Sequence, residues 1–404
     1  MIEKNKIREF IQIVVIFFLF FQHGAALYRY EIADYRNFLV YLSIVLILVF
    51  CPRKSLLFNC IVVVCSLVLC RIFTSNGVGV GEIYIQLEQL CWMYLAVYLC
   101  EDRFAHNYVR CTFILSFISL IFYLITLISP QIFQSFATAS YLSEYWTEEQ
   151  YYVNVFYSYL QNSIRNTSIF TEPGIYQIVV NSAIFILLFC KNQIALSDQS
   201  RVAYLTVFII TIITAQSVTG YIALIVIILF FVFEKTEYIW QTKAKRRIMA
   251  LLIGIIIFCL ILQLLGVGYI FDDILGKVVS NGNIDLSQGS GKYRLVIIAE
   301  TLKTIIKHPL GVGYGTATNI IYAIDKGAAG AAFMFSLMAL GVGHILLLML
   351  IIFSPMRFYK KSHVKFLVIF LYFNTTLAQS KILYPALIML PILLKFEREY
   401  YEEY

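Results

Sequence analysis

The chain has 404 residues, of which 60% are hydrophobic and only 14% are charged, and its mean hydropathy is +0.80. This composition excludes an ordinary soluble domain and predicts a polytopic membrane protein. The formal net charge is +7. For a chain of this kind we expect membrane lipids, and no nucleic acid, among the partners.

Apolar stretches recur along almost the whole chain. Because a membrane helix needs roughly 20 apolar residues, we predict an all-α protein with about twelve transmembrane helices. In chain order, they are expected at residues 8–27, 36–51, 55–73, 83–100, 109–129, 173–190, 202–217, 219–234, 248–270, 328–353, 364–379 and 381–396. The first stretch is long for a secretory signal, so we expect an uncleaved helix there.

The distribution of Lys and Arg predicts the orientation. Short cytoplasmic connections carry an excess of these residues, and here the basic short connections fall on the side of both termini. We therefore expect cytoplasmic termini and two long outer loops, at residues 130–172 and 271–327. The nine cysteines lie in the spans or at their edges and form no CxxC pair. From this pattern we expect no disulfide framework and no metal site.

The exit of the first long loop carries Arg165 and Glu172, followed by Pro173 and Gly174. Thr171 or Glu172 can cap the next helix, Pro173 suits its first turn, and the helix start offers amide groups to an anion. Arginine suits bidentate contact with phosphate, and a carboxylate can pair with it or act as a base. A capped membrane helix with a snorkelling arginine explains the same residues without a ligand, so both interpretations stay open.

The second long loop has a helical pattern between Lys292 and Lys307. Its apolar residues fill an arc of roughly 120°: Leu295, Ile298, Ala299, Leu302, Ile305 and Ile306. Lys292, Lys303 and Lys307 flank this arc on one side and Arg294 on the other. We expect an amphipathic helix on the outer membrane surface with its cations toward phosphate headgroups. A helix that only orients lipid would have the same pattern.

His308, with the proline after it, ends the helical pattern. The glycine-rich turn that follows lets backbone approach a ligand closely, which makes Gly311, Gly313 and Tyr314 candidate substrate contacts. A lone histidine is more often structural than catalytic, and His308 is considered in both roles. Residues 289–292 read GSGK but lack the Ser or Thr and the earlier glycine of a nucleotide loop, so no nucleotide cofactor is expected.

Three groups of residues carry a family resemblance. They are Arg165 with Glu172-Pro173-Gly174, the turn Ser217-Val-Thr-Gly220-Tyr221, and Arg294 followed by His308-Pro309-Leu-Gly311-Val-Gly313. Together they resemble the bacterial O-antigen polymerase (Wzy) and O-antigen ligase superfamily, as does the topology of the chain. Ligases of this superfamily usually carry a second loop histidine before the span that begins near residue 328, and this chain has glycine and alanine there. That departure favours a polymerase.

The resemblance implies an inner-membrane glycosyltransferase of C-type architecture whose two long loops are periplasmic. Such an enzyme joins oligosaccharide repeat units carried on undecaprenyl pyrophosphate, without a nucleotide sugar and without a metal. A chain-length regulator protein is a possible partner of this kind of polymerase.

The chemistry needs cations for the departing pyrophosphate and a base for the acceptor hydroxyl. By the resemblance, Arg165 and Arg294 would bind pyrophosphate, and the base would be His308 or Glu172. Supporting cations would be Lys292, Lys303 and Lys307. The alternatives are a ligase or other lipid-linked glycan transferase, and a lipid-linked oligosaccharide flippase. A flippase would place cations at mid-membrane, and the span interiors hold almost no charge.

Overall fold

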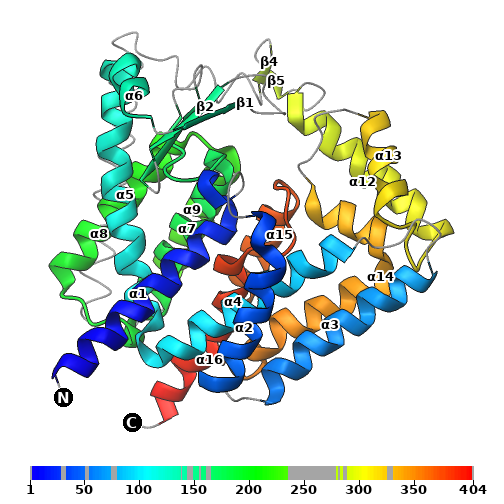
Figure 1. Ribbon diagram of the computed structural model, residues 1–404, viewed down its shortest axis with the longest axis horizontal. Coiled ribbons are helices and arrows are strands. Elements are labelled where there is room, and N and C mark those ends of the chain that lie inside the picture. The colour runs from blue at the N-terminus through cyan, green and yellow to red at the C-terminus, as the bar shows by residue number, and fades with distance from the viewer. Residues whose placement is uncertain are drawn as a thin grey trace.

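The structure is a computed structural model, viewed in Figure 1 with the chain coloured from blue to red. It describes residues 2–28, 33–50, 54–73, 80–137, 139–142, 149–153, 156–160, 165–234, 279–280, 283–284, 289–324 and 331–402. The predicted span at 248–270 lies outside the described residues. Most of what is described is helical, and a helix lies at the position of each of the other predicted spans.

The first part of the chain forms long helices joined by short connections. They are α1 (Ile2–Gly24), η2 (Ala33–Tyr35), α2 (Arg36–Phe50), α3 (Lys54–Phe73), α4 (Val80–Cys100), η3 (Glu101–Arg103) and α5 (Phe104–Ile128). Apolar side chains on the outer faces of α2 and α3 are exposed, as for Phe38 at 63% and Phe58 at 64%. Such surface is costly in water and suits a lipid environment.

The first long loop is more structured than predicted. It contains α6 (Pro130–Phe136) and an antiparallel sheet of β1 (Ala139–Leu142), β2 (Glu149–Val153) and β3 (Tyr157–Leu160). The prediction of an all-α fold is therefore wrong here. Tyrosine and valine favour strands, and Tyr151 and Tyr159 pair across β2 and β3. The sheet packs on α5, where Phe122 stacks on Tyr157 with ring centroids 5.5 Å apart.

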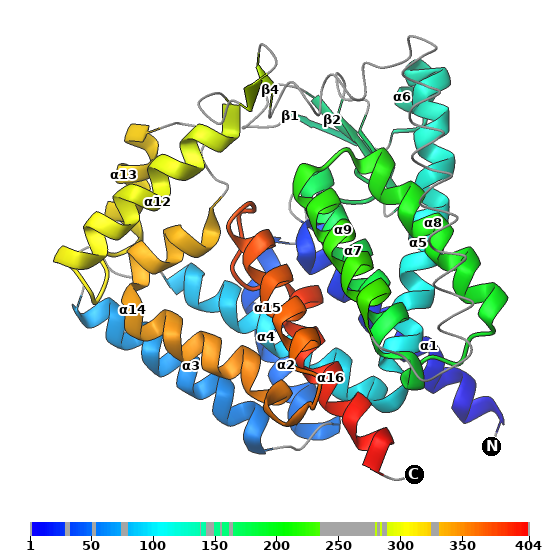
Figure 2. The ribbon, with the colours of Figure 1, turned by 180° about the vertical axis from the view of Figure 1, so that it is seen from behind.

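The second part of the chain returns to helices. Its elements are α7 (Pro173–Phe189), η4 (Lys191–Gln193), α8 (Asp198–Ala215), α9 (Val218–Phe233), β4 (Val279–Ser280), β5 (Asn283–Ile284), α12 (Gly289–Lys307), α13 (Tyr314–Ile324), α14 (Ala332–Phe353), η5 (Ser354–Phe358), α15 (Ser362–Thr376) and α16 (Pro385–Glu402). Every residue of α7 is buried. A helix that is apolar all round belongs inside a bundle, and α7 packs against α5, α8, α9 and α16 (Figure 2).

Three of the described helices are long and apolar enough to cross a membrane. They span Ile83–Cys100, Phe104–Ile128 and Ala332–Arg357. Five shorter apolar helices lie at Glu9–Gly24, Asn37–Phe50, Phe58–Ile72, Pro173–Phe189 and Val218–Phe233. These helices are consistent with a polytopic membrane protein, while the number of twelve spans stays a prediction.

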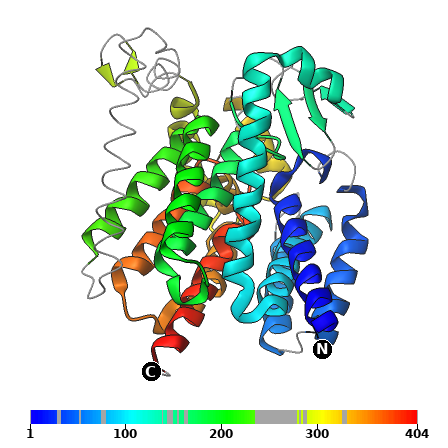
Figure 3. The same ribbon diagram turned by 90° about the vertical axis from the view of Figure 1, so that its left-hand side faces the viewer.

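The two ends of the molecule differ. Both termini lie at one end, and α6 and the strands lie at the opposite end (Figures 1 and 3). Ionic side chains cluster near the termini, where Lys361 bonds Glu234 at 2.5 Å. Nearby, the buried Glu397 accepts hydrogen bonds from Gln193 Nε2 at 3.1 Å and from the Asn192 amide at 3.3 Å. These contacts join the α7–α8 connection to the end of α16.

Candidate functional site

Arg165 lies beside the turn between α8 and α9. Its Nη2 donates a hydrogen bond to the Gln216 carbonyl at 2.7 Å. Gln216 ends α8 in the left-handed conformation with φ 49°, and Ser217 then caps α9 through its hydroxyl, which accepts from the Gly220 amide at 3.4 Å. The Arg165 guanidinium thus lies against the turn at Ser217–Tyr221, one of the three motifs that carry the family resemblance.

Glu172 occupies the cap position of α7 without bonding the helix through its side chain. Its backbone is extended at φ −142° and Pro173 follows at the first helical position. Just before it, the Thr171 amide and hydroxyl both donate to the Gly24 carbonyl, at 3.0 and 3.3 Å. This contact ties the exit of the first long loop to the end of α1.

The predicted anion site at the start of α7 is covered in the structure. A Cβ added to Gly174 would lie 2.3 Å from Gln379 Nε2, so the Gln379 side chain occupies the space over the helix start. The Ile175 and Tyr176 amides bond the Glu172 carbonyl at 3.1 and 3.3 Å, and proline has no amide hydrogen. Two amides of this helix start are therefore bonded to the Glu172 carbonyl, and Gly174 serves close packing of the Gln379 side chain.

Residues 377–384, which connect α15 to α16, contact Arg294 and several other parts of the fold. Arg294 Nη2 donates to the Ala378 carbonyl at 3.3 Å, and the Ala332 amide at the start of α14 donates to the Gln379 carbonyl at 2.9 Å. Lys381 Nζ donates to the carbonyls of Gln22 and His23 at 3.0 and 3.3 Å. The connection lies centrally, between the α1 and α7 side and the α12 and α14 side (Figures 1 and 2). We call residues 377–384 the central connection.

The two arginines are linked through this part of the fold. The Arg165 turn is held to α15 because Asn374 Nδ2 donates to the Thr219 carbonyl at 3.1 Å. Asn374 lies one helical turn before Ala378, the residue that Arg294 contacts. Arg165 and Arg294 thus approach neighbouring parts of one structural unit from two distant segments of the sequence.

The helix α12 lies where the sequence pattern predicted one, and it has two unlike faces. Ile297 and Thr301 are buried, and Arg294 beside them is half-buried, so burial lowers the pKa of its guanidinium. The apolar residues on the other face are exposed and follow a helical stripe: Leu295, Ala299, Leu302 and Ile306. This stripe belongs to the predicted membrane-facing arc, whose contact with lipid stays a prediction.

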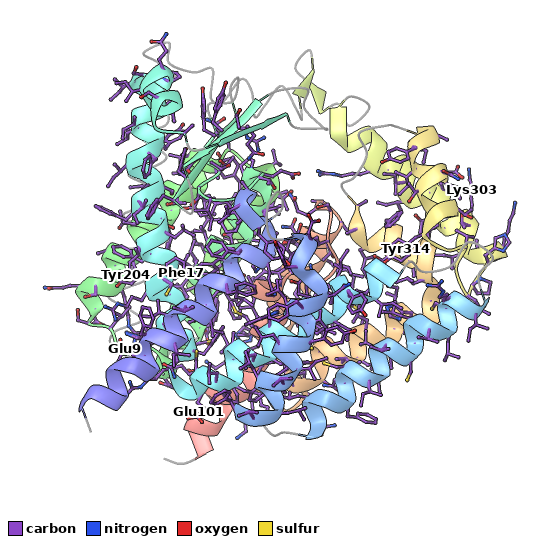
Figure 4. All side chains as sticks on the ribbon, in the orientation of Figure 1. Glu9, Phe17, Glu101, Tyr204, Lys303 and Tyr314 are labelled. Atoms are coloured by element: carbon purple, nitrogen blue, oxygen red, sulfur yellow. The ribbon has the colours of Figure 1, made fainter. Side chains whose placement is uncertain are left out.

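The remaining basic candidates of α12 point outward. Lys303 bonds Glu300 at 2.5 Å with 67% of its side chain exposed, and Figure 4 shows it on the outer side of the helix. Lys307 and His308 are also exposed. The side chain of Lys292 lies outside the described residues. Because a helix rises 1.5 Å per residue, Arg294 and His308 are separated by roughly 20 Å along α12. The structure does not bring these two candidates to one phosphate group.

The glycine-rich turn after α12 approaches another helix. The helix α14 is broken at Gly341, with φ 77° and ψ 172°, so the single span predicted at 328–353 is in fact two helical pieces. The turn inserts at this break. The Val312 amide donates to the Met338 carbonyl at 3.0 Å, and the Val342 amide donates to the Pro309 carbonyl at 2.9 Å. Such bonds satisfy backbone groups that a broken membrane helix would leave bare.

The glycines of the turn fit this docking role. Gly311 has φ +89°, and a Cβ on it would lie 2.5 Å from the Ala339 carbonyl oxygen. The Gly313 amide bonds that same oxygen at 3.0 Å. Tyr314 packs edge to face on Phe335 of α14 at 5.4 Å, on the inner side of α12 in Figure 4. The sequence predicted that the backbone of this turn approaches another group closely. In the structure, the turn makes such an approach to α14.

Sequence reasoning missed the central connection. Gln379, Lys381 and Tyr384 fell in or beside two predicted spans, although Pro385 was a signal that the last helix begins there. A span starting at Pro385 would have left Lys381 in a connection. Among the described residues no three His, Cys, Asp or Glu side chains lie together as a metal site would need.

Residues 203–333 match a family model described as O-antigen ligase. Searches of curated proteins and of solved structures found no match. The matched segment contains Arg294, His308 and the glycine-rich turn, whereas Arg165 and Glu172 precede it. This match, over about a third of the chain, supports the predicted resemblance to the O-antigen polymerase and ligase superfamily.

Proposed function

We propose that the protein polymerises oligosaccharide repeat units carried on undecaprenyl pyrophosphate, at the periplasmic face of the bacterial inner membrane. The acceptor hydroxyl attacks the anomeric carbon of the donor sugar, the bond to pyrophosphate breaks, and the hydroxyl proton passes to a base. The departing group is an anion, so two fixed arginines near it would stabilise the transition state.

The observation that carries this proposal is that Arg165 and Arg294 bond two segments that are held to each other. Arg165 donates to the Gln216 carbonyl and Arg294 to the Ala378 carbonyl, and the hydrogen bond from Asn374 to the Thr219 carbonyl holds the turn after Gln216 to the helix before Ala378. The arginines come from the two long loops, which the sequence places outside the membrane on the same side. A lipid-linked donor could reach them there, and a chain-length regulator could act on the growing product.

The experiment uses purified protein with lipid-linked repeat units isolated from cells that lack the polymerase. Arg165→Ala and Arg294→Ala should each lower chain extension by about a hundredfold or more, the usual effect of removing one electrostatic donor. Lysine at either position should restore only part of the activity, because it lacks the planar fork. Arg103→Ala, at the exposed α4–α5 connection, is the matched control. Wild-type extension rates in both arginine variants would refute the site.

A ligase is the second candidate, since the matched family model carries that description. The two activities differ in the acceptor. A polymerase joins one lipid-linked unit to another and gives longer chains on the lipid, whereas a ligase transfers the chain to a different acceptor. Chains that lengthen when lipid-linked units are the sole glycan support polymerisation. Transfer only after addition of a lipopolysaccharide core acceptor would identify a ligase.

A further inference from the structure

The residue after Arg165 is a buried asparagine for which the proposed function has no role. Asn166 is fully buried, and its Nδ2 donates hydrogen bonds to Thr214 Oγ1 at 3.1 Å and to Ser119 Oγ at 3.3 Å. Its backbone amide donates to the Thr214 carbonyl at 2.9 Å. A buried amide without partners would be costly. These bonds therefore explain why a polar residue is stable here, and they fix Asn166 to α5 and α8 together.

The same side chain fixes the path of the loop after Asn166. Its Oδ1 accepts a hydrogen bond from the Ser168 amide at 3.1 Å, which closes a turn of the kind that asparagine favours. Ser168 has a left-handed backbone with φ 53°, a conformation that residues other than glycine adopt rarely. The Ser168 carbonyl in turn accepts from the Ser158 amide of β3 at 2.5 Å. Asn166 thus bonds the fold through the oxygen of its side chain as well as through the nitrogen.

The end of α8 links Asn166 to the side chain of Arg165. Thr214 lies in the last turn of α8, and Gln216 is the residue that ends this helix. Asn166 bonds Thr214, and Arg165 Nη2 donates to the Gln216 carbonyl at 2.7 Å. Consecutive Cα atoms are about 3.8 Å apart across a planar peptide, so the backbone of Arg165 moves with Asn166. The asparagine therefore fixes the base of the arginine side chain, while Gln216 bonds its guanidinium.

The Ser119 hydroxyl joins Asn166 to a buried group of hydroxyls between α5 and α7. Ser119 Oγ lies 2.7 Å from the Tyr176 hydroxyl, which donates to Ser116 Oγ at 3.2 Å. All three side chains are fully buried. A satisfied buried network of this kind is rigid. A residue that only joins α5 to α8 would make the same bonds as Asn166, so a role in the reaction must be tested by measurements that are specific to Arg165.

We propose that Asn166 is a positioning residue that holds Arg165 in place for the departing pyrophosphate. This inference rests on the proposed function. Asn166 acts through the backbone of Arg165, and no contact of the asparagine with substrate is needed. Displacement of a catalytic group by about 1 Å is enough to lower a rate strongly. Because Arg165 would stabilise charge that develops in the transition state, its displacement should lower kcat and leave KM nearly unchanged.

The first test is the kinetics of chain extension by the purified protein with lipid-linked repeat units. Asn166→Ala should lower kcat by about tenfold or more and change KM by less than about twofold. In the Arg165→Ala background, the same substitution should lower kcat by less than about twofold, because residues that act as a unit are not additive. An equal loss of kcat in both backgrounds would show that Asn166 acts independently of Arg165 and would overturn the proposal.

Asn107 provides the matched control on α5. It is buried, its Nδ2 donates to Gln12 Oε1 at 3.2 Å, and it lies roughly three helical turns before Ser119. Asn107→Ala removes a buried asparagine amide away from Arg165 and should leave kcat close to that of the wild type. If Asn107→Ala lowers kcat as much as Asn166→Ala does, the effect is a general loss of stability and the proposal is wrong.

A second test follows the Arg165 guanidinium without any glycan substrate. Phenylglyoxal modifies accessible guanidinium groups, and mass spectrometry of the Arg165 peptide gives the rate. Arg165 is half-buried, so its modification should be roughly threefold faster or more in Asn166→Ala and unchanged in Asn107→Ala. Equal rates in the wild type and Asn166→Ala would overturn the positioning role, even if Arg165→Ala abolishes extension. Faster modification together with wild-type extension in Arg165→Ala would instead refute the proposed site and keep the positioning of Arg165 by Asn166.

Discussion

Substitution of Gly341 by alanine should destabilise the protein more than its position in an apolar helix indicates. Its φ of 77° and ψ of 172° lie in a region that is essentially restricted to glycine, which costs another residue about 1–3 kcal/mol. The added Cβ would also lie 2.3 Å from the Leu310 carbonyl carbon and 2.6 Å from the Pro309 oxygen. These are backbone atoms, and the Pro309 oxygen accepts the Val342 amide hydrogen bond. Overpacking of this kind costs a further 1–3 kcal/mol or so.

The expected loss is therefore about 2–6 kcal/mol. For a chain of this size it corresponds to a fall in melting temperature of roughly 2–7 °C. The assay is thermal unfolding of purified protein in one detergent at a fixed heating rate, because membrane proteins often unfold irreversibly. Gly311→Ala should have a similar effect, since its φ is +89° and its Cβ would meet the Ala339 oxygen. The double variant should lose less than the sum, because both changes break one interface.

Gly343 provides the matched control two residues away in the same helix. A Cβ there meets nothing within 4 Å, and its φ is not positive. Alanine at this position should leave the melting temperature unchanged or raise it slightly, since alanine is the better helix former by about 0.5–1 kcal/mol. If Gly341→Ala melts like Gly343→Ala, the break in α14 does not depend on glycine and the reasoning is wrong.

Three further predictions concern topology, the base and the ionic cluster. A cysteine at Lys303 should react with an impermeant maleimide in intact cells, and one at Arg357 should react only after lysis; the reverse pattern would invert the topology. His308→Ala should slow chain extension less than tenfold and Glu172→Gln by about 10²–10⁴-fold, and a larger effect at His308 would make it the base. Burial raises the pKa of Glu397 above its ordinary value of 4.5, so its protonated form is favoured in the folded state and its contribution to stability falls as pH rises through that pKa. The melting temperature of the wild type minus that of Glu397→Gln should therefore decrease as the pH is raised from acidic to neutral. A difference that stays constant with pH would contradict this.

The positions of the helices could be predicted because each apolar run is long and bounded by polar residues. The run at Pro173–Phe189 is an example, with a proline at its start and burial along its whole length. The strands were missed because the tyrosines at 151, 152, 157 and 159 suit the headgroup layer of a membrane as well as a strand. Their short runs also match strand propensity. Sequence pattern alone does not separate these alternatives, since the pairing of β2 with β3 decides between them.

The candidate site was predicted in part. Arg165, Glu172 and Arg294 could be proposed from the sequence because charged side chains are rare in it and these three lie in the long loops. Lys381 was missed because its partners are the carbonyls of Gln22 and His23, more than 350 residues away in the chain. The docking role of Gly311 could not be predicted from the sequence either. A turn that approaches a ligand and a turn that docks into a broken helix need the same glycine.

The contacts of α12 connect the glycine-rich turn to the proposed chemistry. At one end of this helix Arg294 contacts the central connection at Ala378, and at the other end the turn docks into the break of α14. The start of α14 also bonds the central connection, through the Ala332 amide and the Gln379 carbonyl. The helix, the broken helix and the connection thus form a closed arrangement in which Gly311 and Gly341 fix the position of a guanidinium that they do not touch. The motif around Gly311 can therefore matter for catalysis without contacting substrate, because displacement of a catalytic group by about 1 Å is enough to reduce a rate strongly.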